Sequence, residues 1–209
     1  MLVYAWNTRH QWVSSLRVRL STNEVRTLMR FGLPLAFSGL AYWGLTATSA
    51  IVLRGYSNYG ELGVYSATNS FAGVAAIFQS IFTLVWAPTV YKWASQGVNL
   101  ARVDEIAGRA LVVACLIFFT VGCFSWLTDY LLPPHYGEVK HLLVSGITPP
   151  LLYTLSEITG VGIGITRRTM ATLWITISAL IANVLLSLWL IPIHGATGAV
   201  TANTVAFAV

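Results

Sequence analysis

Residues 170–191 read MATLWITISALIANVLLSLWLI, a stretch without a charged side chain. An α-helix needs about 20 predominantly apolar residues to cross the hydrocarbon core of a bilayer. This stretch therefore predicts a transmembrane helix that begins near Met170 and ends near Ile191.

Further segments of the same character precede and follow this stretch. Four precede it, at residues 31–53, 64–90, 110–132 and 142–165, and another begins at Gly195 and is still apolar at Val209. These segments predict an all-α fold, a polytopic membrane helix bundle of about five complete transmembrane helices plus a truncated sixth. The predicted transmembrane unit is residues 31–209, incomplete at its C-terminus.

Composition argues against a water-soluble domain. Hydrophobic residues make up 56% of the chain and charged residues only 9%, which leaves too little polar surface for a globular protein of this length. The net charge of +5 does not indicate nucleic acid, because the basic residues lie in connections and helix ends rather than in one aromatic-rich patch. We interpret them as topology determinants that face anionic lipid and predict no nucleic-acid partner.

The twelve Lys and Arg residues divide unequally between the two sides of the predicted bundle. The N-terminal side carries Arg9, Arg17, Arg19, Arg26, Arg30, Lys92, Arg102, Arg109, Arg167 and Arg168, and the opposite side carries Arg54 and Lys140. Because cytoplasmic connections carry the excess of positive residues, the N-terminal side is predicted to be cytoplasmic.

Residues 1–30 are predicted to form a basic cytoplasmic connector with an interfacial helix. Ser21 and Glu24 have the Ser-x-x-Glu spacing of a capping box, which marks the start of a helix. An apolar face begins at Val25. Both functional coupling and simple anchoring are compatible with such a helix.

Polar side chains inside the predicted spans recur every three to four residues, which places them on one face of each helix. The stripes are Ser38, Tyr42, Thr46 and Ser49; Ser66, Asn69, Gly73, Ser80 and Thr83; and Thr172, Thr176, Asn183 and Ser187. A polar group that faces lipid has no water to bond, so these faces are expected to contact protein or a wet cavity. They form either interhelical hydrogen bonds or a central polar cavity, in which Thr46, Asn69 and Asn183 are the expected hydrogen-bonding residues.

The predicted fourth span carries an acidic residue, Glu157, near its centre. A charged side chain at that depth costs about 3 kcal/mol. Pro149 and Pro150 lack backbone donors and are expected to kink or break the same helix, which frees carbonyl groups. Glu157 is therefore either an ion- or proton-coupling carboxyl or a neutral acid that locks two helices together.

Catalytic and metal-binding patterns are missing from the sequence. The histidines, at positions 10, 135, 141 and 194, lie in connections or at helix ends. Cys115 and Cys123 lie about 12 Å apart along one predicted helix, too far to form a disulfide. We predict a protein that is not an enzyme and has no metal and no cofactor.

Four motifs follow one another along the chain: LMRFGLPL at 28–35, ELGVYS at 61–66, WAP at 86–88 and IPIHGATGA at 191–199. In order and spacing they resemble the second half of polysaccharide flippases of the multidrug/oligosaccharidyl-lipid/polysaccharide export superfamily. The resemblance covers nearly the whole chain from about Leu28 onward.

This resemblance implies one lobe of a two-lobe transporter in the bacterial inner membrane. Such a protein moves an undecaprenyl-pyrophosphate-linked glycan, such as an O-antigen repeat unit of lipopolysaccharide, to the outer leaflet by alternating access. The implied partners are this lipid-linked glycan, the bilayer, the other lobe, and polysaccharide polymerase and glycosyltransferases. The arginine-rich stretch before Phe31 then corresponds to the connector between lobes.

One departure from the family pattern concerns the first helix. Flippases of this type often have Ser-Asp-Arg near its middle, and here the corresponding stretch is Thr48-Ser49-Ala50. Arg54 is either a substitute phosphate contact or a side chain that extends to the membrane interface. A drug/cation antiporter of the same superfamily and a non-transporting scaffold for glycan-assembly enzymes remain alternative functions.

Overall fold

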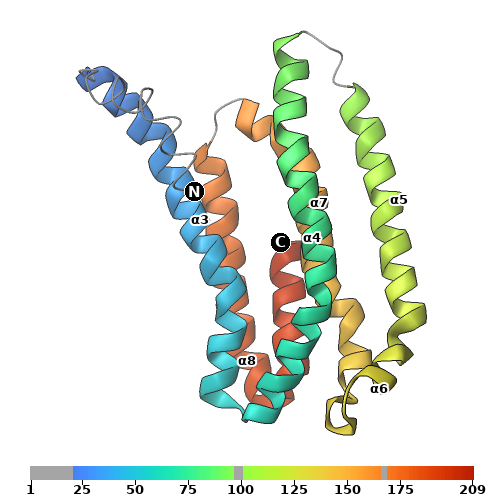
Figure 1. The fold of residues 1–209 in the computed structure, drawn as a ribbon. Helices are drawn as coiled ribbons and strands as arrows, with labels where there is room; N and C mark the ends of the chain where they lie inside the picture. Colours follow the sequence, from blue (N-terminus) through green and yellow to red (C-terminus); the bar gives the residue numbers. More distant parts are fainter. Residues whose placement is uncertain (1–20, 97–100, 166–168) are drawn as a thin grey trace, which may run out of the picture.

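The structure is a computed structural model that describes residues 21–96, 101–165 and 169–209. Figure 1 shows that these residues form a bundle of helices, which confirms the all-α fold. The long helices are α3 (Thr22–Tyr56), α4 (Tyr59–Ser95), α5 (Ala101–Phe124), α7 (Val139–Ile165) and α8 (Thr169–Ala208). Short helical turns at Ser125–Leu127, α6 (Thr128–Leu131) and Pro134–Tyr136 connect α5 to α7.

Length and apolar character allow four helical segments in the described part of the chain to cross a membrane. They are Thr22–Tyr56, Tyr59–Ser95, Val103–Leu131 and Thr169–Ala208. Large apolar side chains cover their outer faces, as in Leu84, Phe119 and Trp189, which are 77%, 72% and 70% exposed. Apolar surface on this scale is unsuited to water and fits lipid, so the fold is that of a membrane protein.

The predicted number of spans depends on α7 and α8. The 27-residue α7 (Val139–Ile165) contains the predicted fourth span but is not one of these four segments. The predicted fifth span and the start of the sixth both fall within α8, where the backbone is non-helical at Gly195 (φ 55°, ψ −127°). Five complete spans and a truncated sixth stay a prediction.

Two helix pairs organise the bundle. Helix α3 packs along α8 and α4 along α7, while α7 also contacts α5 and α8. The two pairs converge at the end where α3 meets α4 and diverge toward the other end, and the C-terminal part of α8 lies between them (Figure 1). A buried cluster that includes Leu53, Tyr65, Val139 and Ile191 joins the pairs where they converge.

Pro149 and Pro150 do not break α7, which is continuous from Val139 to Ile165. A proline removes the donor that the carbonyl four residues earlier would accept from, and for Pro149 that carbonyl belongs to Ser145. The hydroxyl of Thr204 in α8 donates to the Ser145 carbonyl over 3.0 Å. This carbonyl therefore links α7 to α8.

The predicted capping box is present at the start of α3. The Glu24 backbone N–H donates to Ser21 Oγ over 3.2 Å, and the Ser21 N–H donates to the Glu24 carboxylate over 2.8 Å. The expected interfacial helix is continuous with the first span, because α3 runs through Pro34 without a break.

Part of the predicted basic connector lies outside the described residues. These are residues 1–20, which include Arg9, Arg17 and Arg19. Arg167, Arg168 and the side chain of Arg102, predicted in later cytoplasmic connections, also lie outside the described residues.

Candidate functional site

Helices from both pairs meet around Glu157. The half-buried Glu157 of α7 accepts a hydrogen bond from the Thr83 hydroxyl of α4. The ion pairs among the described residues are Arg109–Glu105 and Lys140–Asp129. No described cation therefore pairs with the Glu157 carboxyl.

Aromatic side chains complete the surroundings of this carboxyl. Tyr153, one turn before Glu157, lies with its ring centroid 5.1 Å from that of Tyr42 in α3. Tyr42 packs edge-on against Phe207 of α8, with 6.1 Å between centroids, and its side chain lies near that of Gln79 in α4. We call Glu157, Thr83, Tyr42, Tyr153 and Gln79 the Glu157 cluster.

This cluster draws its side chains from three helices, with Phe207 of α8 at its border. It therefore bridges the α3–α8 pair and the α4–α7 pair, and a movement of one pair against the other would change its contacts. A carboxyl beside hydroxyl groups and away from cations can exchange a proton, because a hydroxyl donates to the charged form and accepts from the neutral form.

Asn183 lies in a different place, a fully buried seam between α3 and α8. Its Oδ1 accepts from Ser187 over 2.9 Å and from Ser49 over 3.4 Å. Its Nδ2 donates to Asn203 Oδ1 over 3.2 Å and to the Leu45 carbonyl over 3.4 Å. At this position the polar stripe forms interhelical hydrogen bonds.

The other predicted site residues lie on exposed surfaces. Thr46 donates to the Trp43 carbonyl of its own helix over 2.9 Å. Asn69 is exposed on α4, and Arg54 is exposed in the last turn of α3. Within the described residues, no hydrogen bond or ion pair joins any two of these five predicted site residues.

Several contacting residues were not among the predicted site residues. Tyr42 and Thr83 belong to the polar stripes, and Tyr153 lies one helical turn from Glu157, so helical spacing was the signal for these three. No local pattern indicated Gln79. No local pattern indicated Glu61 either. Its carboxylate accepts a hydrogen bond from the Ala196 backbone N–H over 2.7 Å.

We expect Asn183→Leu to lower the free energy of unfolding by about 2 kcal/mol. Leucine has a similar size but leaves the Leu45 carbonyl and Asn203 without this partner, and an unsatisfied buried polar group costs about 1–3 kcal/mol. The measurement is thermal unfolding in detergent, followed by circular dichroism. Asn69→Leu is the matched control, because Asn69 is exposed, and equal stability of the two variants would contradict the assignment.

Comparison of the chain with protein families, with curated proteins and with solved structures gave no match. Among the described residues, no group of His, Cys, Asp and Glu side chains is placed to hold a metal ion. The features of this chain that indicate a function are therefore its sequence motifs and the Glu157 cluster.

Proposed function

We propose that this chain forms one lobe of a bacterial inner-membrane transporter that moves lipid-linked polysaccharide repeat units to the outer leaflet. The observation that carries this proposal is the Glu157 cluster, in which an acid without a described cation partner is bonded between α7 and α4 and Tyr42 of α3 contacts Tyr153 of α7. The order of the four sequence motifs supplies the substrate class. Five complete spans and a sixth, with the N-terminal side cytoplasmic, belong to the same proposal.

The proposed mechanism is alternating access of two lobes around a polar cavity. Glu157 takes up and releases a proton or ion, and its change of charge alters its bond between α4 and α7 and, through Tyr153 and Tyr42, the contact with α3. The exposed faces of α3 and α4 that carry Thr46 and Asn69 face this cavity and the other lobe. Arg54 contacts the pyrophosphate, whereas Asn183 keeps α3 and α8 together as a unit during the movement.

The distribution of the lipid-linked glycan between leaflets tests this function. We expect deletion of the gene to make the glycan accumulate in the inner leaflet, and the intact gene to restore its appearance in the outer leaflet. An unchanged distribution of the glycan between leaflets in the deletion strain would contradict the proposal. If glycan enzymes also fail to assemble at the membrane in that strain, the chain is a scaffold.

The acidic residue also supports a second function within transport, a drug/cation antiporter. An antiporter uses a membrane carboxyl to exchange a proton or ion for a cationic substrate. The deletion strain separates the two functions, because an antiporter predicts greater sensitivity to cationic drugs with normal glycan distribution.

A further inference from the structure

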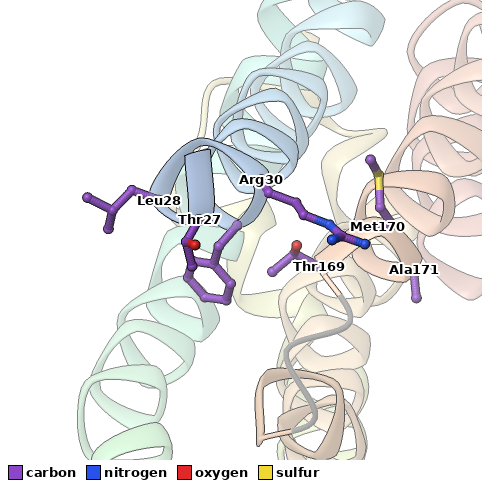
Figure 2. A pocket seen from close by; sticks show the side chains of 7 residues that line it. Thr27, Leu28, Arg30, Thr169, Met170 and Ala171 are labelled. Atoms are coloured by element: carbon purple, nitrogen blue, oxygen red, sulfur yellow. The ribbon is translucent and has the colours of Figure 1, made fainter. Parts of the chain in front are cut away.

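A groove opens between α3 and α8 at the end of the bundle where both helices begin. It has a volume of about 800 Å³ and is lined by Thr27, Leu28, Arg30 and Phe31 of α3 and by the first turn of α8, Thr169 to Ala171. Figure 2 shows Arg30 extending from α3 toward the start of α8, where Thr169 and Met170 lie beside it. The groove thus has an apolar wall and a cationic end.

The positive charge at this groove is not neutralised by described acidic residues. Arg30 is exposed and forms no ion pair within residues 21–96, 101–165 and 169–209. Arg26 lies one turn earlier and lines an adjoining recess together with Arg30. Two arginines at this spacing repel each other, so an anion between them is favoured.

Thr169 provides a second, independent feature. This residue is only 7% exposed and lines the groove, and its hydroxyl forms no hydrogen bond to another described residue. A threonine hydroxyl that lines such a groove can donate a hydrogen bond to a bound group. The backbone N–H groups of the first α8 turn lie at the same place, where a helix favours negative charge.

The position of the groove along α3 defines what kind of anion fits. Arg30 directly precedes the apolar run that begins at Phe31, so it lies at the border between hydrocarbon and headgroups. The apolar wall is formed by Leu28, Phe31 and Met170, which are 61%, 41% and 57% exposed. A free anion would leave this apolar wall uncovered, whereas an acyl chain covers it.

We propose that this groove binds an anionic phospholipid of the surrounding bilayer. The phosphate accepts hydrogen bonds from Arg30, Thr169 and the first turn of α8, and an acyl chain lies along Leu28, Phe31 and Met170. Basic pockets between membrane helices bind acidic headgroups by the same physics. The site is separate from the proposed transport function, since it uses no residue of the Glu157 cluster.

Native mass spectrometry of the full chain in detergent, with phosphatidylglycerol or phosphatidylcholine added, tests this site. We expect the wild-type protein to bind phosphatidylglycerol more tightly, and Arg30→Gln to reduce that binding about tenfold, the usual effect of losing a hydrogen bond to a charged group. Thr169→Val is expected to reduce it about threefold. Binding by Arg30→Gln equal to wild type would overturn the proposal.

Lys92→Gln is the matched control, because Lys92 is an exposed cation in the last turn of α4 at the same end of the bundle (Figure 1). It removes the same charge outside the groove and is expected to leave phosphatidylglycerol binding unchanged. Equal losses in Lys92→Gln and Arg30→Gln would show general surface attraction and overturn the site. Displacement of phosphatidylglycerol by millimolar inorganic phosphate would overturn its assignment to a lipid.

Discussion

Glu157→Gln is expected to reduce glycan export to the level of the deletion strain while the protein stays folded and present in the membrane. The amide has the size of the carboxyl, and its oxygen still accepts from the Thr83 hydroxyl. It cannot gain or lose a proton, so the change of charge that couples the helix pairs is lost. The measurement combines glycan at the cell surface with the amount of protein in the membrane.

The control for this variant is Glu105→Gln, which makes the same chemical change on α5. Glu105 forms an exposed ion pair with Arg109, and exposed pairs contribute only about 0–1 kcal/mol. We therefore expect normal export from Glu105→Gln. Normal export from Glu157→Gln would remove Glu157 from the mechanism and leave it as a bond between α4 and α7.

Helical spacing predicted part of the α3–α8 seam but not which face of each helix is buried. The predicted stripe on α3 included Ser38 and Ser49, and both are buried. It also included Thr46, which is exposed because the buried row passes through Leu45 instead. Residues 45 and 46 differ by about 100° around the helix, and only the position of α8 decides between them.

The sequence patterns did not predict contacts between residues that lie far apart in the chain. Glu61 and Ala196 lie 135 residues apart, and their hydrogen bond depends on the break at Gly195. The groove at Arg30 likewise exists because the start of α8 lies beside residues 27–31 of α3. Periodicity within one helix describes its own faces, whereas such sites are created by packing between helices.

Gly195→Ala is expected to prevent accumulation of the folded protein. The backbone there has φ 55° and ψ −127°, a conformation that L-residues reach only at a cost of about 1–3 kcal/mol. An added Cβ would also overlap the Glu61 carboxylate and displace it from the Ala196 N–H, a charged hydrogen bond that contributes about 1.5–3 kcal/mol. The sum is a large part of the total stability of a typical domain, about 5–15 kcal/mol. Folded protein is measured by size-exclusion chromatography in detergent.

Two further variants separate the backbone strain at residue 195 from the overlap of the added Cβ with the Glu61 carboxylate. In a Glu61→Ala background the carboxylate is absent, so Gly195→Ala should there cost only the backbone strain, and the difference between the two backgrounds measures the coupling of the two residues. Gly39→Ala in α3 is the control, because a Cβ at Gly39 meets no atom within 4 Å and alanine favours a helix by about 1 kcal/mol over glycine. If Gly195→Ala were as stable as Gly39→Ala, the Glu61 carboxylate would not hold the C-terminal part of α8 in place. The hydrogen bond between Glu61 of α4 and the Ala196 N–H of α8 would then not be what fixes this segment against α4.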